Sequence, residues 1–584
     1  MQVPSSFEQE SIQQDQEIEQ AHDGDEADRQ YLNKIRSVHN FGDREDFSHP
    51  PESLFQPSQR REAPIDNELV QNILATSEAD IMVDEYRQMS ASFPFVVLPS
   101  KTSGSELHAS KPMLFLAVLT VASWRDHRRQ MSLDSIFRQE LANRTIISPR
   151  RTLGLVQSVL VYLSWYHFVF SHKTQQIFFL HHLVIGLALD IGLHQDYQPL
   201  SFPHRPKPPP VSAQAHRERQ RAFLGCYYLA SMIAAGLQKP NLLRHSSDMT
   251  EWAQNLKCHG EYDSDQTICH LISLRQIDDQ IQDTLFAGSA AKAPLTDARI
   301  LMHLRFMEAQ LDTWRRDSFG SPSHRLLDLS SSYTDMLLHS IALRPQLTSD
   351  LPATTDSTQL KALLSTLEAG KRFLDALLSF PAHEYHLISF SEWMRLPTVI
   401  MTISRLCMPS EAHVAAGWDV KAAQDRVRLE LCLESLCYRM QSLSTYEKKK
   451  QSHPDFWYAM RFIIDMTKSW YIRKIRPVVP KFPSSIPTPS GTEGNLASER
   501  SGPSSGAQST PSFCQAGQHY PSLAGINHMS ETNLDLGMNV EEDSGGPFSF
   551  LKDLDFDMEQ FFDIGIWGDE SYVGMGFGGG NMRI

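Results

Sequence analysis

Three long apolar segments between Lys111 and Leu256 place the tightest limit on how this chain can fold. The first covers 111–124, the second covers 155–170 and is followed almost at once by 176–195, and the third covers 216–245. No other part of the sequence can bury as much apolar side-chain area per residue. Burial yields ~25 cal/mol per Å² of apolar surface, which offsets the conformational entropy lost on ordering. We therefore expect the core to form here first.

The same segments are poorly suited to a bilayer. A membrane-spanning helix tolerates few polar or ionisable residues, and the two longest runs contain Gln157, Ser164, His167, His181, His182 and Asp190. We expect buried core helices instead, and no membrane partner. The N-terminal residues carry neither a basic n-region nor an apolar h-region, so we expect no signal peptide.

The charge balance and the cysteines limit the class of protein. The 584 residues include 69 Asp and Glu against 54 Lys and Arg, which argues against a chain that coats nucleic acid along its whole length. The seven cysteines form no CxxC pair. Such scattered cysteines are typical of free thiols in a reducing compartment.

Helical periodicity continues beyond Leu256, and no alternating run amounts to a credible strand. The sequence predicts an all-α fold with disordered N- and C-terminal tails. Ser77 and Asp80 are expected to form a capping box. The expected helices cover 112–129, 131–144, 152–170, 174–194, 265–285, 297–314, 332–343, 357–379, 386–408, 421–443 and 454–475.

Composition divides the chain into five expected segments. The first is rich in Gln and acidic residues, the third is rich in Pro, Ser and Gly, and the last is rich in Gly. The segments are a disordered arm over 1–65, an all-α domain over 66–476, a linker over 477–547, an acidic-hydrophobic segment over 548–570 and a tail over 571–584.

The acidic-hydrophobic segment, 548–570, is the most informative compositional feature of the chain. It carries one Lys against seven acidic residues, interleaved with apolar ones. The acidic residues keep the aromatic ones solvated, and the segment can dock its apolar face into a partner groove. This composition is that of a transcriptional activation segment; the alternative is a helix that folds back onto the domain. The expected partner-binding residues are Leu554, Phe556, Phe561, Phe562 and Trp567.

Two motifs resemble metal sites without matching them. All-α terpene cyclases bind Mg²⁺ through aspartates on a helix, but Asp278 and Asp283 in IDDQIQD lie five apart and no second Mg²⁺ motif follows. His383 and His386 lack the spacing that puts both imidazoles on one metal. A polar helix face and ordinary histidines are the favoured interpretations. We therefore expect no catalytic residue, no cofactor and no metal ligand.

The central block resembles the regulatory middle region of fungal zinc-cluster transcription factors. The matching pieces are FPFVVLP with KPMLFLAVLTVAS, and then LVQSVLVYLSWYHFVF with QIFFLHHLVIGLALDIGLHQ. The strongest match is the third apolar segment, with its basic start, Phe223, Gly225, the Cys226-Tyr227-Tyr228 run and Lys239-Pro240. The likeness covers roughly 93–256 well and is looser to about 475. It implies an all-α regulatory domain.

One departure from that family changes the expected function. Family members usually carry an N-terminal six-cysteine cluster that holds two zinc ions and places a helix in the major groove. No cysteine occurs here before Cys226. We therefore expect no direct DNA binding by the residues present, and contact with DNA only through a partner or through N-terminal residues missing from this sequence.

These features together favour a nuclear, non-enzymatic regulator of transcription. Its helical domain would be regulatory, and its acidic segment would recruit the transcription machinery or coactivators. A helical interaction scaffold without an activating role is the first alternative, and an all-α metal-dependent enzyme of the terpene-cyclase type is the second. Assembly as a homo- or heterodimer is left open.

Overall fold

The computed structural model describes residues 30, 31 and 34 and most of 62–476. The gaps inside that range are 170–175, 196–211, 238–240, 288–289, 291–292, 296, 322, 344–353, 411–412, 414–415, 450 and 452–453. All regular structure within these described residues is helical, without a strand, which confirms the all-α prediction. None of the helices described has both the length and the apolar character needed to cross a bilayer.

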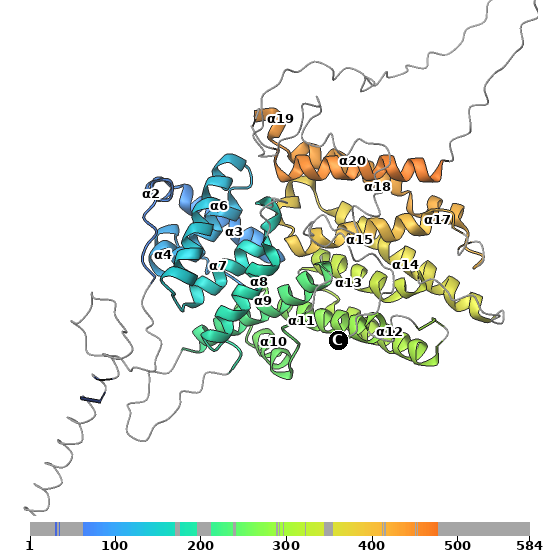
Figure 1. Cartoon of the computed structure of the whole chain (residues 1–584), viewed down its shortest axis with the longest axis horizontal. Helices are drawn as coiled ribbons and strands as arrows, with labels where there is room; N and C mark the ends of the chain where they lie inside the picture. The colour runs from blue at the N-terminus through green and yellow to red at the C-terminus, as the bar shows by residue number, and fades with distance from the viewer. Residues whose placement is uncertain are drawn as a thin grey trace, which may run out of the picture. The chain divides into compact units, whose positions relative to one another are not determined.

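The helices up to α10 contain the three apolar segments (Figure 1). They are α2 (Glu68–Ala75), α3 (Glu78–Met89), α4 (Gly104–Ser110), α5 (Pro112–Ala122), α6 (His127–Ala142), α7 (Leu153–Ser164), α8 (Ile177–Asp190), α9 (Ala213–Leu237) and α10 (Ser247–His259).

The second half continues the helical array, and α13 packs beside α14 and α18 beside α20 (Figure 1). Its helices are α11 (Asp265–Ile281), α12 (Ala298–Ser318), α13 (His324–His339), α14 (Thr354–Ser379), α15 (Phe390–Cys407), α17 (Val420–Val427), α18 (Leu429–Leu443), α19 (Tyr446–Lys449) and α20 (Phe456–Ile475).

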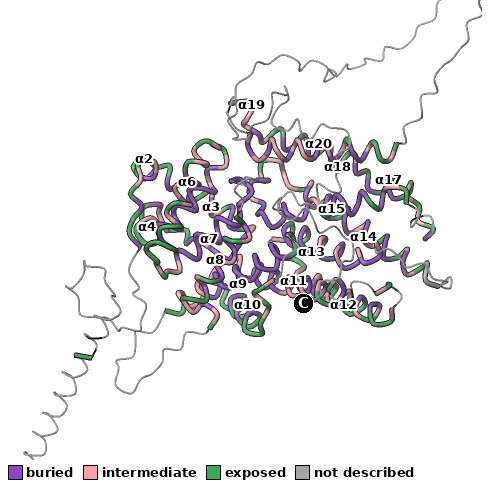
Figure 2. Tube along the Cα trace, in the orientation of Figure 1, coloured by how far each residue is buried: buried purple, intermediate pink, exposed green. Residues whose placement is uncertain are grey.

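The predicted apolar segments form the centre of the core. All residues from Met113 to Leu119 and nearly the whole of α7 are buried. Figure 2 shows buried residues along α7, α9 and α15, and exposed ones along α10 and α12. One connected set of buried side chains runs from Ile65 to Tyr471. The helices that follow α9 therefore share a core with the segments that were expected to fold first.

The segment FPFVVLP lies inside this core without forming a strand. Phe93, Phe95 and Val96 are buried, and the ring of Phe95 lies 5.1 Å from that of Tyr228, centroid to centroid. The Tyr86 hydroxyl donates a 2.7 Å hydrogen bond to the Val96 carbonyl. This bond provides a partner for a backbone group that has no sheet to pair with.

Several predicted helices are divided by local caps. The expected helix 112–129 ends at Ala122, because Asp126 caps a new helix by accepting a hydrogen bond from the Arg129 N–H at 3.2 Å. The expected helix 421–443 breaks at Arg428, whose φ of 51° is left-handed.

Other bounds also differ from the prediction. The third apolar segment, 216–245, contributes most of α9, which ends at Leu237. The expected helix 332–343 begins eight residues earlier, at His324, and its last four residues, Ser340–Leu343, form a 3-10 helix. Apolar spacing continues across short turns, so periodicity alone does not fix the residue at which a helix begins or ends.

The predicted capping box of Ser77 and Asp80 is wrong. The Ser77 side chain makes no capping hydrogen bond. Asp80 instead accepts a 2.7 Å hydrogen bond from the N–H of Gly104, the first residue of α4. A capping box does form at Ser103 and Glu106, where α4 begins. Asp80 therefore joins α3 to α4 rather than capping its own helix.

Candidate functional site

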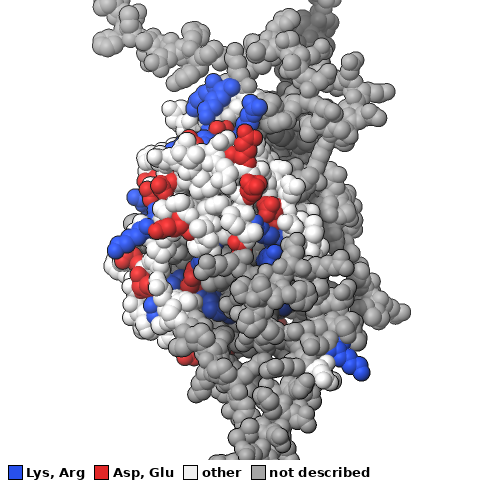
Figure 3. Space-filling model, turned by 90° about the vertical axis from the view of Figure 1, so that its left-hand side faces the viewer, with Lys and Arg blue, Asp and Glu red and all other residues white. Residues whose placement is uncertain are grey.

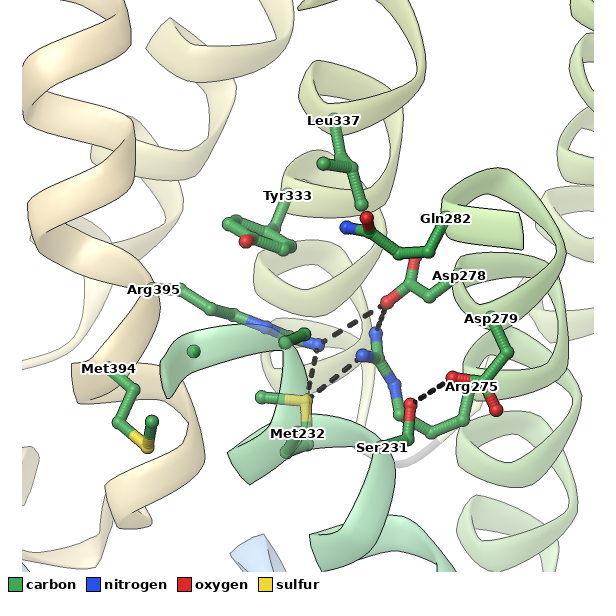
Figure 4. Close-up of a pocket in the computed structure, with 12 residues that line it drawn as sticks. Ser231, Met232, Arg275, Asp278, Asp279, Gln282, Tyr333, Leu337, Met394 and Arg395 are labelled. Carbon is green, nitrogen blue, oxygen red and sulfur yellow. Dashed lines mark hydrogen bonds and ion pairs between the residues drawn. The ribbon is translucent and has the colours of Figure 1, made fainter. Parts of the chain in front are cut away.

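Charged side chains meet inside the protein where α9, α11, α13 and α15 converge (Figure 4). We call this set the buried charged cluster. Each of its five central residues is at most 4% exposed. They are Met232 on α9, Arg275 and Asp278 on α11, and Glu392 and Arg395 on α15.

The four charged residues of the cluster come as two pairs, and each pair has the spacing that puts both residues on one face of a helix. Arg275 and Asp278 are three residues apart on α11, and Glu392 and Arg395 are three apart on α15. Residues at this spacing lie on one face of a helix. In both helices that face is also the one that packs against the core, so each helix carries an ion pair into the interior.

The two arginines make a dense set of contacts around Met232 (Figure 4). Arg395 Nη1 donates to both carboxylate oxygens of Glu392, at 2.7 and 2.6 Å. Arg395 Nη2 lies 3.2 Å from the Met232 sulfur, and Arg275 Nη1 lies 3.0 Å from the same atom. Arg275 Nη2 pairs with Asp278, whose Oδ2 is also 3.9 Å from Arg395 Nη2.

Hydroxyl groups complete the hydrogen bonding of Glu392. Ser330 on α13 donates to Glu392 Oε1 at 3.0 Å, and it accepts from Arg395 Nη1 at 2.9 Å. The Tyr228 hydroxyl on α9 lies 3.4 Å from the same carboxylate oxygen. The Arg395 guanidinium stacks 4.8 Å from the Tyr333 ring centroid. The cluster thus connects four helices through one carboxylate and one guanidinium.

Burial controls the electrostatics of the cluster. Burial raises the pKa of Asp278, and the charges of Arg275 and Arg395 oppose that change. Burial also raises the pKa of Tyr228, which keeps its hydroxyl protonated. Two guanidinium groups face two carboxyl groups, so removal of either partner leaves a charge without compensation in a low dielectric.

The cavity beside the cluster is small. Its volume is about 20 Å³, and its lining includes Ser231, Gly236, Asp279, Gln282 and Met394. A space of this size is large enough for one water molecule and too small for an organic ligand. We infer that the cluster joins helices and does not bind a substrate.

The acidic motif of the enzyme hypothesis is divided among separate contacts. Asp278 belongs to the buried charged cluster. Asp279 accepts hydrogen bonds from the hydroxyls of Tyr227 and Ser231, at 2.7 and 2.6 Å. Asp283 pairs with Arg244 at 2.7 Å. Within the described part of the chain, no group of three or more His, Cys, Asp or Glu side chains could hold a metal ion.

The histidines singled out in the sequence lie in separate environments. His386 stacks on the Trp124 ring at 4.2 Å, and its Nε2 lies 3.0 Å from Glu85 Oε1. His383, three residues earlier, is largely exposed. His181 is buried, with Nε2 3.5 Å from the Cys226 carbonyl oxygen. Each has its own local contacts, and the structure does not bring them together.

Sequence reasoning missed the buried charged cluster and named other residues. The expected partner-binding residues lie outside the described residues; they are Leu554, Phe556, Phe561, Phe562 and Trp567. The missed signal was present in FSEWMRLP, where Glu392 and Arg395 fall among large apolar residues. Charges at core positions of a helix indicate a buried pair.

Basic and acidic side chains are mixed on the face drawn in Figure 3. That face is the left-hand side of Figure 1, beside α2, α4 and α6. Among the residues described there, Lys and Arg alternate with Asp and Glu instead of forming one basic stripe. A surface of this kind gives a phosphate backbone little net attraction.

The helical domain is similar to a domain of fungal transcription factors. Residues 82–316 match the model of the fungal specific transcription factor domain. This match is consistent with the regulatory middle region that the resemblance implied, and it supports a regulator of transcription. No solved structure matches the chain.

Three curated proteins illustrate the relationship. "Transcription factor himD" of Aspergillus japonicus is 23% identical over 421 residues, which are 68% of this chain and 67% of that relative. "Transcription factor opdL" of Penicillium oxalicum is 22% identical over 412 residues, 68% of this chain and 71% of that relative. "Transcription factor pbcR" of Emericella nidulans is 28% identical over 266 residues, 43% of this chain but only 36% of that relative.

The buried charged cluster crosses the end of the matched region. Met232, Arg275 and Asp278 lie within 82–316, whereas Glu392 and Arg395 lie beyond it. Arg275 and Asp278 pair with each other on α11, and the contacts of Met232 and Asp278 with Arg395 reach α15, outside the family match. The core also extends beyond the match, to Tyr471.

Proposed function

We propose that this chain is a nuclear regulator of transcription that activates through its C-terminal acidic-hydrophobic segment. The helical domain is regulatory and contacts proteins, and residues 548–570 recruit the transcription machinery or coactivators. The observation that carries this proposal is the family match over 82–316 in a chain that also carries an acidic-aromatic segment over 548–570.

The chemistry of the segment supports recruitment. Phe561, Phe562 and Trp567 offer large apolar areas that gain free energy on burial in a partner groove. The neighbouring carboxylates keep these rings in water before binding and steer the segment toward a basic partner. The segment requires no fold of its own for this role.

Contact with DNA is proposed to occur through a partner protein or through N-terminal residues beyond this sequence. The cysteines are poorly placed to replace a zinc cluster, since Cys226, Cys269, Cys407 and Cys437 are free and buried. Burial raises the pKa of the Cys226 and Cys437 thiols to about 12, which disfavours the thiolate that zinc requires.

A helical interaction scaffold is the second candidate. Large apolar side chains on the surface, such as Tyr438 on α18 and Phe179 on α8, favour it because exposed apolar groups suit protein contacts. This candidate differs from the first only in giving residues 548–570 no activating role.

One experiment separates the two candidates. The whole chain is fused to a heterologous DNA-binding domain beside a reporter gene, with and without residues 548–570. We expect activation that depends on the segment, and nuclear fluorescence from a tagged copy. Equal reporter output with and without the segment would favour the scaffold, and exclusion from the nucleus would refute the localisation.

A further inference from the structure

A second and much larger cavity opens between α10, α11 and α12. Its volume is about 500 Å³, against about 20 Å³ beside the buried charged cluster. Helix α11 packs against both of the other helices (Figure 1). We call this cavity the α10–α12 groove. Sites for small organic molecules typically measure ~300–1,000 Å³, so the groove has the size of such a site.

The floor of the groove contains an imidazole that is almost completely buried. His270 on α11 is 3% exposed, and its ring lies 6.2 Å from that of Trp314 on α12, edge to face. The Trp314 Nε1 atom donates to the His270 backbone oxygen at 2.9 Å, which ties the Trp314 ring to the backbone of α11. His270 Nε2 is buried without a hydrogen-bond partner among the described residues.

A second polar atom in the groove lacks a partner in the same way. The Oε1 atom of Gln280, also on α11, is buried and accepts no hydrogen bond from the described residues. A buried polar atom without a hydrogen-bond partner destabilises the protein. Either atom would be satisfied by a ligand hydroxyl that donates to it.

The walls of the groove supply aromatic surface and no net charge. Phe306 on α12 is 56% exposed although it is a large apolar residue, and the Trp314 ring lies farther in. Lys257 on α10 and Asp317 on α12 oppose each other in sign, and the remaining lining side chains are uncharged when His270 is neutral. Burial lowers the pKa of His270 and so favours its neutral form.

We propose that the α10–α12 groove binds an uncharged aromatic compound bearing a hydroxyl group. The ring packs against Phe306 and Trp314, and the hydroxyl donates to His270 Nε2. A hydroxyl can donate to this acceptor, whereas a carboxylate cannot. The neutral lining gives an anion no compensation for leaving water. This proposal is independent of the proposed role of residues 548–570.

A partner helix is the other possible occupant, and the groove is less suited to it. A docked helix presents an apolar face and would leave the polar atoms of His270 and Gln280 without partners. Met302, which is 60% exposed one turn from Phe306, is not part of the groove lining. It therefore provides a matched control on the same helix.

The test is calorimetric titration of the whole chain with 2-naphthol, and with 2-naphthoate as the anionic counterpart. We expect saturable binding of 2-naphthol at one site per chain and binding of 2-naphthoate weaker by about tenfold or more. Filling the groove with Ala309→Trp should abolish binding. Phe306→Ala and His270→Phe should each weaken it by about fivefold or more, since each removes one contact.

The control variant is Met302→Ala. It should change the affinity for 2-naphthol by less than about twofold, because it removes an apolar side chain outside the groove. Circular dichroism melting identifies any variant that fails to fold, and the Phe306→Ala and Met302→Ala pair alters only exposed side chains. Absence of saturable 2-naphthol binding, or binding that survives Ala309→Trp, would overturn the proposal, as would equal affinity for 2-naphthoate.

Discussion

A Cβ atom at Gly225 would lie 2.8 Å from the Cβ atom of Phe95. This separation is shorter than two carbon atoms tolerate without a shift in one of them. Gly225 is in the middle of α9, where glycine costs ~1 kcal/mol relative to alanine. The close approach of the FPFVVLP segment explains why glycine stands at this position in spite of that cost. Leu160 on α7 packs against the same position.

The first prediction follows from this contact. Gly225→Leu should lower the free energy of unfolding by ~1–3 kcal/mol through overpacking. Denaturant titration followed by circular dichroism measures the change. Gly186→Ala on α8 is the control: nothing lies within 4 Å of its Cβ position, so it should stabilise by up to ~1 kcal/mol. A Gly225→Leu protein as stable as the natural one would place α9 outside the core.

The second prediction concerns the buried charged cluster. Arg395→Met should lower the free energy of unfolding by ~3–5 kcal/mol, because Glu392 loses its guanidinium partner in the interior. The double variant Arg395→Met with Glu392→Met should recover part of that loss, since no buried charge is left unpaired. Denaturant titration of both proteins provides the comparison.

An exposed ion pair is the matched control for that experiment. Arg244 and Asp283 lie 2.7 Å apart with more than half of each side chain exposed. Arg244→Met should change the free energy of unfolding by less than ~1 kcal/mol. If Arg395→Met costs no more than Arg244→Met, the cluster does not hold the helices together.

The third prediction is a pH dependence. Burial alone would lower the pKa of His339, but hydrogen bonds to Asp335 and Glu308 outweigh it and raise that pKa to about 9. The unfolded value is 6.5, so the folded state binds the proton more tightly. This stabilisation is fully present below pH 6.5 and is lost as the pH rises to about 9.

The variant His339→Gln isolates that contribution. The natural chain should lose roughly 2–3 kcal/mol of stability between neutral and alkaline pH through this group. The variant should show a flatter profile over the same range, because glutamine does not titrate. Denaturant midpoints at several pH values measure both profiles, and parallel profiles would contradict the assignment of a charged His339 between α12 and α13.

The fourth prediction concerns DNA. The purified chain should give no sequence-specific gel shift at physiological salt, because its described surface in Figure 3 mixes charges and its sequence lacks a base-reading zinc cluster. Elemental analysis of the same sample should find no stoichiometric zinc. A shifted band that survives excess non-specific DNA, or about two zinc ions per chain, would restore direct binding.

The sequence predicted the parts of the fold that depend on local pattern. Runs such as Met113 to Leu119 can remove their apolar surface from water only in a core. Gly225 inside an apolar helix indicated close packing of a neighbouring element. It could not predict the buried charged cluster, since Arg395 and Met232 are 163 residues apart in the chain. It also missed the left-handed Arg428, because nothing in a periodic pattern signals a positive φ at arginine.

The partner-binding residues remain a prediction from composition. They lie outside the described residues, so their role depends on chemistry alone. Aromatic side chains contribute large buried areas in a partner groove, whereas one solvated charge among several contributes little. Loss of rings should therefore reduce activation more than loss of any single charge.

The most direct test of the account is a reporter assay on residues Asp535 to Asp569 fused to a heterologous DNA-binding domain. The natural segment should activate, and the variant with Phe561, Phe562 and Trp567 changed to Ala should not. Asp557→Asn, the matched single-charge control, should reduce the output only slightly. A silent natural segment, or a triple-alanine segment as active as the natural one, would contradict the account.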